Sequence, residues 1–126
     1  MAGIVVRAAH YPRRAPIDAY GNGGFRFAGM SHRGSLLCLP SGIYGWDPTG
    51  RIDRQTLIKV FEESDAIEVL LVGTGRDVAP LDADLAAALR ERGIVADAMS
   101  TGAAVRTFNV LLAEDRAVAA ALLAVD

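Results

Sequence analysis

Apolar and polar positions follow one pattern before Gly50 and another after it. In the first part, short apolar runs separated by glycine-rich turns predict strands, so this part is mostly β. The expected strands are Phe25–Phe27, Ser35–Leu39 and Ile43–Trp46, and the small residues from Gly29 to Gly34 are expected to close a hairpin between the first two.

Beyond Gly50, apolar residues recur at helical spacing. Asp53 is the expected N-cap of a helix that turns Leu57, Val60 and Phe61 toward a sheet. That helix must pack on a sheet.

A strand, a helix and a second strand are expected in succession over residues 67–98. The apolar run 67–72 predicts the first strand and 94–98 the second, with an amphipathic helix between them. Such a β-α-β crossover is right-handed and makes its two strands parallel. The small residues Gly73-Thr74-Gly75 and Ser100-Thr101-Gly102 follow these strands, so they should meet at the carboxyl edge of the sheet, where open α/β sheets usually bind ligands.

A third helix is predicted from Thr101. Ala104 and Phe108 lie on its core side, and Ser100 or Thr101 is its natural N-cap. The tail, residues 116–125, is rich in alanine, and propensity alone predicts a helix there as well.

Length, composition and charge narrow the class of protein. The 126 residues, 52% of them hydrophobic, predict a single domain, 1–126, in which residues 1–20 are partly an irregular arm with an early strand at Ile4–Val6. A net charge of -2 leaves no field to attract a phosphate backbone, so no nucleic-acid partner is expected. Apolar runs of strand length and the lack of a signal-like segment predict a soluble, cytoplasmic protein. Cys38 is expected to be a small apolar residue in a buried strand.

The two small-residue junctions at the carboxyl edge are the candidate ligand site. The helix that begins at Thr101 offers N–H groups and a positive dipole end that suit a small anion. Arg106 and Asn109 could line the rim, and Asp97 stands where a ribose-binding acid would be expected. The candidate ligand-binding residues are Gly73, Thr74, Gly75, Asp97, Thr101, Gly102, Ala103, Ala104, Arg106 and Asn109.

A plainer explanation of the same helix start stays open. Ala103 and Ala104 would be small only to pack tightly on the sheet, and Ser100 or Thr101 would cap the free N–H groups. A dinucleotide is disfavoured because Val78 stands where the third glycine of its fingerprint belongs.

No other residues form a recognisable catalytic or metal-binding group. His10, His32 and Cys38 lack the spacing of metal ligands, and Ser35 and Ser41 do not lie in a nucleophile elbow. We therefore expect no metal, no cofactor and no identifiable catalytic residue.

Several stretches, taken in order, resemble one family. The chain resembles, from about Tyr20 onward, the small domain found in mitochondrial NADH dehydrogenase (complex I) assembly factor three and its uncharacterised bacterial relatives. The stretches that carry the resemblance are Tyr20–Phe25, Gly34–Leu37, Trp46, Val72–Gly75, Pro80-Leu81, Met99-Ser100-Thr101-Gly102-Ala103-Ala104 and Arg106–Asn109.

The resemblance implies a particular fold. It implies a three-layer α/β domain with a mixed central sheet, in which residues 117–125 form a strand antiparallel to its neighbours rather than a helix. Family members tend to have glycine where Asp115 stands, and aspartate tolerates the left-handed turn that glycine favours.

The resemblance and the residues of the crevice lead to two candidate functions. The first is a non-catalytic interaction or assembly factor with protein partners, linked to the assembly of respiratory complex I or to the biogenesis of membrane proteins, because the family implies no established enzymatic activity. The alternative is a protein that binds a small molecule or anion, or a weak enzyme, using the crevice between the Gly73–Gly75 turn and the Thr101 helix start. The sequence leaves the oligomeric state open, and also whether Tyr44 and Trp46 face a core or an interface.

Overall fold

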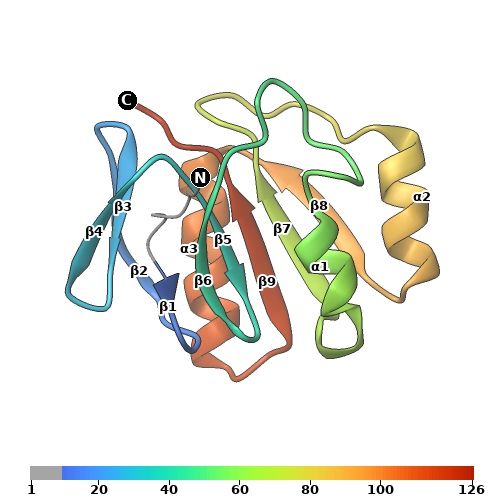
Figure 1. Cartoon of the computed structure of the whole chain (residues 1–126), viewed down its shortest axis with the longest axis horizontal. Coiled ribbons are helices and arrows are strands. Elements are labelled where there is room, and N and C mark those ends of the chain that lie inside the picture. Colours follow the sequence, from blue (N-terminus) through green and yellow to red (C-terminus); the bar gives the residue numbers. More distant parts are fainter. Residues whose placement is uncertain (1–9) are drawn as a thin grey trace, which may run out of the picture.

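The computed structural model describes residues 10–126, so the predicted strand at Ile4–Val6 lies outside the described residues. Nine strands and three α-helices follow one another along this part of the chain (Figure 1). The strands are β1 (His10–Tyr11), β2 (Ile17–Gly21), β3 (Gly24–Phe27), β4 (Met30–Arg33), β5 (Ser35–Leu39), β6 (Gly42–Trp46), β7 (Val69–Gly73), β8 (Val95–Met99) and β9 (Val118–Leu122); the helices are α1 (Ile58–Glu62), α2 (Ala83–Glu91) and α3 (Thr101–Ala113), with a 3-10 turn at Ser64–Ala66.

The strands form two sheets. The larger sheet has the order β1-β6-β5-β9-β7-β8, and β2, β3 and β4 form a separate antiparallel sheet. In the larger sheet, β7 is parallel to both β8 and β9, whereas β5 is antiparallel to β6 and β9. The mixed sheet and the parallel β-α-β unit of β7, α2 and β8 confirm the predicted fold class.

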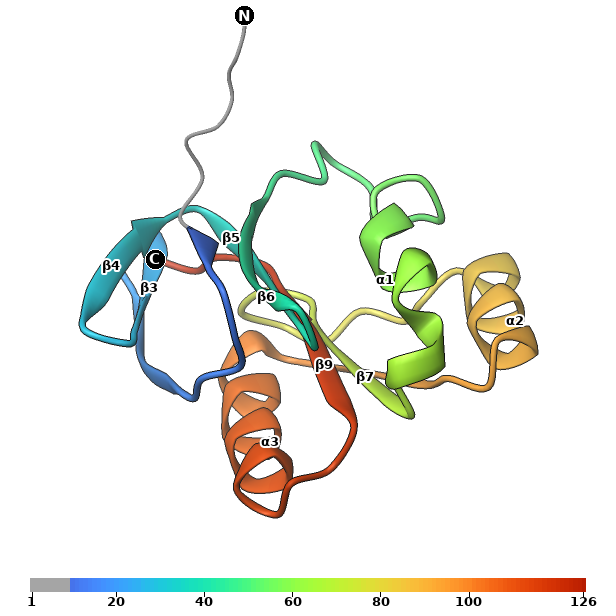
Figure 2. The ribbon, with the colours of Figure 1, turned by 60° about the horizontal axis from the view of Figure 1, so that its bottom comes forward.

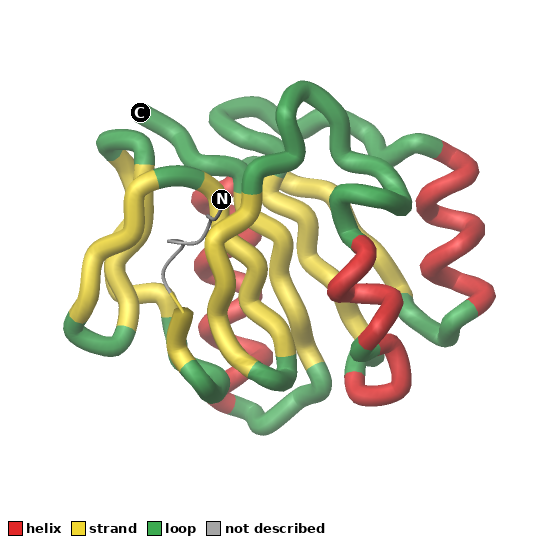
Figure 3. The backbone as a smooth tube through the Cα atoms, in the orientation of Figure 1, coloured by secondary structure: helices red, strands yellow, loops and turns green. Residues whose placement is uncertain are grey.

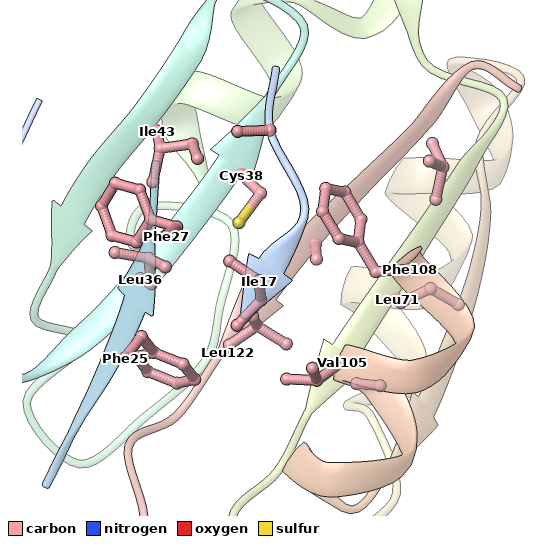
Figure 4. Packing of buried hydrophobic residues seen from close by; sticks show 14 residues of the cluster. Ile17, Phe25, Phe27, Leu36, Cys38, Ile43, Leu71, Val105, Phe108 and Leu122 are labelled. Atoms are coloured by element: carbon pink, nitrogen blue, oxygen red, sulfur yellow. The ribbon is translucent and has the colours of Figure 1, made fainter. Parts of the chain in front are cut away.

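The larger sheet is the middle of three layers. Helices α1 and α2 lie on one side of it and α3 on the other, as the turned view and the tube both show (Figures 2 and 3). The three-stranded sheet shares the layer of α3, because Phe25 and Phe27 pack in one buried cluster with Phe108 of α3 (Figure 4). A second cluster fills the other side, beneath α1 and α2.

Strand β9 shows why helix propensity fails for the tail. All five of its residues are buried, with Val118, Ala120 and Leu122 in one cluster and Ala119 and Ala121 in the other. A strand covered on both faces and paired on both edges gains far more from burial than alanine gains from a helix. The strand is antiparallel to β5, as the family resemblance implied, but parallel to β7, which corrects the expectation for that neighbour.

The predicted hairpin between Phe25–Phe27 and Ser35–Leu39 is wrong. Residues Met30–Arg33 are not part of a loop but form β4, which pairs with β3 through a two-residue turn. Ala28 and Gly29 both have positive φ, 50° and 77°, as a tight hairpin turn with right-handed twist requires. Strand β4 is polar and partly exposed, so its sequence lacks the apolar alternation by which a strand is recognised.

Several local predictions are confirmed. Asp115 adopts the left-handed turn, with φ 58°, before β9. Leu57, Val60 and Phe61 are buried, although the regular helix begins only at Ile58. The predicted N-cap is not confirmed, because the N-cap of α1 is Leu57 and no side chain caps it. Asp53 acts in the turn before the helix, where its carboxylate accepts a 2.9 Å hydrogen bond from the Thr56 N–H, and this bond holds the pKa of Asp53 below its usual value.

Trp46 belongs to the core. Its side chain is 9% exposed and its indole N–H donates a 2.8 Å hydrogen bond to the carbonyl of Thr56. Tyr44 is half-buried against the same cluster, and its hydroxyl bonds Ser41 Oγ. These contacts make Trp46 a packing residue rather than an exposed interface anchor.

Candidate functional site

The two small-residue junctions meet at one edge of the larger sheet, as the β-α-β unit predicts. Gly73 pairs with Met99 at the ends of β7 and β8. Beyond the strands the two segments continue to bond each other: the Thr74 N–H donates to the Met99 carbonyl, and the Thr101 N–H donates to the Gly75 carbonyl, each at 2.8 Å. The predicted crevice between them is therefore joined by backbone hydrogen bonds.

Thr101 ties three segments together at this edge. Its side chain is fully buried, and its hydroxyl donates a 2.7 Å hydrogen bond to the carbonyl of Leu123 while accepting a 3.0 Å hydrogen bond from the Gly75 N–H. The Leu123 N–H in turn donates to the Gly73 carbonyl. A buried hydroxyl with both a donor and an acceptor partner is a structural feature, because the alternative is an unpaired polar group.

Thr101→Val is expected to lower the free energy of unfolding by about 2 kcal/mol, because the shape is kept while two half-buried backbone groups, the Gly75 N–H and the Leu123 carbonyl, lose their partner. Urea unfolding followed by circular dichroism measures the change. Thr101→Ser keeps the hydroxyl and should cost about half as much. A larger loss in Thr101→Ser than in Thr101→Val would show that the methyl group, not the hydroxyl, holds this edge together.

Glycine is required at both positions of the first junction, at Gly75 by the backbone conformation and at Gly73 by close packing. The sharp exit expected after the apolar strand predicts such a requirement for at least one of them. Gly75 has φ 102°, in the left-handed region that disfavours other residues. A Cβ on Gly73 would lie 2.9 Å from the Cα of Thr101, so the helix start packs directly on the strand end. The small residues here allow the start of α3 to pack closely against the end of β7.

The start of α3 is largely satisfied by its own residues. Ser100 is the N-cap of α3, which confirms one of the two predicted alternatives. Its Oγ accepts a hydrogen bond from the Ala103 N–H at 3.3 Å. The Ala104 N–H bonds the Ser100 carbonyl, and the Ala104 side chain is fully buried. A Cβ on Gly102 would collide with the Tyr20 hydroxyl, which β2 places over the helix start. The packing explanation is therefore supported for the buried Ala104, and the capping explanation for the N–H of Ala103, while Gly102 meets only the end of the Tyr20 side chain, which is 42% exposed.

Two hollows flank this closed seam. The first, of about 260 Å³, lies on the α3 side and contains Gly75, Gly102, Arg76 and Arg106 with the end of the chain. The second, of about 480 Å³, lies between the loops that follow β6 and β7 and is mostly apolar; its walls include Ile52, Pro80 and Leu81, with Thr74 and Leu123 also in its lining. The Arg51 guanidinium and the Asp82 carboxylate, 3.2 Å apart, join those two loops.

The other predicted site residues lie elsewhere. The Asn109 side chain bonds both backbone groups of Ile17 at 2.8 Å, which fastens α3 to β2. Asp97 is exposed in the middle of β8 and lines neither hollow. The structure thus brings together Gly75, Gly102 and Arg106, buries Gly73, Thr101 and Ala104, and separates Asp97 and Asn109 from the crevice.

Sequence reasoning missed Tyr20 and the second hollow. Tyr20 approaches Gly102 from a different sheet, and the Arg51–Asp82 pair joins loops 31 residues apart in sequence. Neither contact has a local signal, because both depend on how the layers pack.

The described residues hold no cluster of three or more His, Cys, Asp or Glu side chains that could bind a metal ion. The Cys38 thiol is buried, and burial raises its pKa, so it stays protonated and is a poor nucleophile. Within residues 10–126, no helix has the length and apolar character needed to cross a membrane.

Comparison with known proteins defines the class. The family described as "Protein of unknown function (DUF498/DUF598)" matches residues 17–123, and the chain belongs to this family. The chain is 44% identical over 108 residues to an uncharacterised protein of Rhodobacter capsulatus, covering 86% of this chain and 83% of that one. It resembles a Bartonella henselae crystal structure, described as an outer membrane protein, with TM-score 0.90 and 65% identity over 92% of this chain and 99% of the other.

The family includes the assembly factors that the sequence resembles. The mouse protein named NADH dehydrogenase [ubiquinone] 1 alpha subcomplex assembly factor 3 is 30% identical over 122 residues, which are 95% of this chain. The chain spans 66% of the length of that mouse protein. The resemblance stated from the sequence is thereby confirmed, and the shared part includes both small-residue junctions.

Proposed function

We propose that this chain is a non-catalytic assembly factor that binds protein partners while a membrane-bound respiratory complex of the NADH dehydrogenase type is built. The mouse relative carries the name of such a factor, and its similarity runs over 95% of this chain. Binding needs a stable surface rather than a reactive group, and the three packed layers provide one.

The observation that carries this proposal is the closed seam at the carboxyl edge. Five hydrogen bonds join the Gly73–Gly75 turn, the end of β8 with the Thr101 helix start, and Leu123: Thr74 N–H to Met99, Thr101 N–H to Gly75, Gly75 N–H to the Thr101 hydroxyl, that hydroxyl to Leu123, and Leu123 N–H to Gly73. Directly between the two junctions, where an open α/β sheet usually holds its substrate, the space is filled by the chain itself, and the two hollows lie to either side of it. This arrangement favours recognition through the outer surface.

Deletion of the gene in its native source tests the proposal. We expect the amount of assembled NADH dehydrogenase complex in membranes, measured by native gel electrophoresis and activity staining, to fall at least several-fold. Expression of the wild-type chain from a plasmid should restore it. An unchanged amount of assembled complex in the deletion strain would contradict the proposed function.

A second candidate is the binding of a small anion in the 260 Å³ hollow. The observation that favours it is the presence of two exposed guanidinium groups, Arg76 and Arg106, from different elements beside the backbone of Gly102. Two cations near a helix N-terminus attract phosphate or carboxylate, and Asp126 in the same lining opposes this attraction. If anion binding is the function, the double variant Arg76→Ala/Arg106→Ala should fail to restore complex assembly in the deletion strain. The assembly proposal expects this variant to restore it.

A further inference from the structure

Strand β8 ends the larger sheet. Among residues 10–126 its one strand neighbour is β7, so its other edge is open (Figure 1). The side chain of Val95 is 67% exposed, the most exposed of the large apolar side chains described. Asp97 is also exposed and has no ion-pair partner in this part of the chain.

The hydrogen bonds to β7 show which backbone groups of β8 face outward. The Val95 N–H donates to the Glu68 carbonyl at 2.9 Å, and the Met99 carbonyl accepts from the Thr74 N–H. In a parallel pair, alternate residues point both groups at the same neighbour, so Asp97 also points at β7. The N–H and C=O groups of Ala96 and Ala98 therefore form the open edge.

The two faces of β8 differ. Ala96 packs with the cluster beneath α2, so that face is covered. Val95, Asp97 and Met99 lie on the face toward α3, where Met99 packs on the core but Val95 and Asp97 are exposed. The open edge is thus bordered on one face by an apolar, an acidic and a second apolar side chain.

We propose that the open edge of β8 binds an extended segment of a partner protein, which adds to the sheet as an antiparallel strand. The proposal rests on the proposed function and names the surface and the partner for it. The segment carries a basic side chain opposite Asp97 and apolar side chains two residues to either side, opposite Val95 and Met99. Main-chain hydrogen bonds to Ala96 and Ala98 give affinity, and the charge gives specificity.

The geometry places the basic residue well. With Ala96 and Ala98 in hydrogen-bonded pairs, Asp97 falls in a non-hydrogen-bonded pair, where opposed side chains are closest. An opposite charge there is favourable and a like charge is unfavourable.

The same charge disfavours a second copy of this chain as the partner. A two-fold pairing that uses both open residues sets Ala96 against Ala98 of the other copy and Asp97 against its own equivalent. Shifted registers need Ile94 or Ser100, but the Ile94 N–H already bonds the Leu89 carbonyl and the Ser100 carbonyl accepts from the Ala104 N–H. The repulsion between the two aspartates protects the edge from self-association.

Titration of the full chain with two short peptides tests the proposal by NMR of backbone amides. The probes are acetyl-Val-Thr-Lys-Thr-Val-amide and its partner with glutamate at the centre. We expect the lysine peptide to shift the amide signals of Ala96 and Ala98 most and to bind about fivefold more tightly than the glutamate peptide. In Asp97→Lys the preference should reverse, while Asp97→Asn should discriminate little.

Ala98→Pro is the backbone control. It removes an outward N–H that β7 does not use, so the fold should be kept and peptide binding lost. Largest shifts on other elements, or equal binding of the two peptides, would overturn the proposal, and neither result depends on a variant. If the peptides do not bind while gene deletion still lowers complex assembly, the docking surface is wrong and the proposed function stands. If the peptides bind at β8 while gene deletion leaves complex assembly unchanged, the docking surface stands and the proposed function is wrong.

Discussion

Replacing Ala120 by proline is expected to abolish the stable folded state. Ala120 is fully buried in β9, opposite Cys38 of β5 and Leu71 of β7, so both of its edges are paired. Proline removes a ladder hydrogen bond and forces its ring between two strands in the centre of the sheet. We expect a loss of at least about 3 kcal/mol, a large part of the usual stability of a domain, measured by urea or thermal unfolding.

Two variants control for causes other than the strand pairing. Ala120→Gly keeps the N–H and should cost about 1 kcal/mol. Ala98→Pro places the same residue in an edge strand at an outward N–H and should be tolerated far better. If the two prolines cost the same, β9 is not the interior strand described here.

Gly73→Val is expected to have the second largest effect, about 3 kcal/mol of destabilisation from overpacking. The new Cβ would lie 2.9 Å from the Cα of Thr101 and 3.1 Å from the Cδ2 of Leu122. Neither neighbour can move easily, because the N–H and hydroxyl of Thr101 are hydrogen-bonded and Leu122 is fully buried. Thermal unfolding measures the loss.

Gly75→Ala separates this steric cost from backbone strain. A Cβ on Gly75 meets no atom within 4 Å, but the residue has φ 102°, so alanine should cost only about 1 kcal/mol. A melting temperature left unchanged by Gly73→Val would refute the close packing of the helix start on the strand end.

The elements that the sequence predicted well are those with a local signal. Strand β7 is a nearly unbroken apolar run, and Ser100 stands directly before the helix it caps, so both can be recognised without knowledge of the fold. Strand β4 has no such signal because its residues are polar and border an exposed sheet. Strand β9 has a misleading local signal, because alanine favours helices by intrinsic propensity. In the folded protein, burial between two layers outweighs that preference.

The sequence predicted that the two small-residue junctions meet at one edge of the sheet, but not that they bond directly to each other. Parallel pairing alone brings Gly73 and Thr101 to one edge, and this part follows from topology. Whether the space between them is open depends on Leu123 and Tyr20, which arrive from β9 and from the second sheet. The small residues signal close approach of backbone, and only the packed structure shows that the approaching group belongs to the same chain.

The most direct test of a function by protein binding compares two rescue variants in the deletion strain. One plasmid carries Asp97→Lys, at the open edge of β8, and the other carries Arg76→Ala/Arg106→Ala, at the polar hollow; the readout is the amount of assembled NADH dehydrogenase complex in membranes at matched protein levels. We predict that the arginine variant restores assembly as fully as the wild type and that Asp97→Lys restores much less. Full rescue by Asp97→Lys together with failure of the arginine variant would contradict the account and place function in the anion-binding hollow.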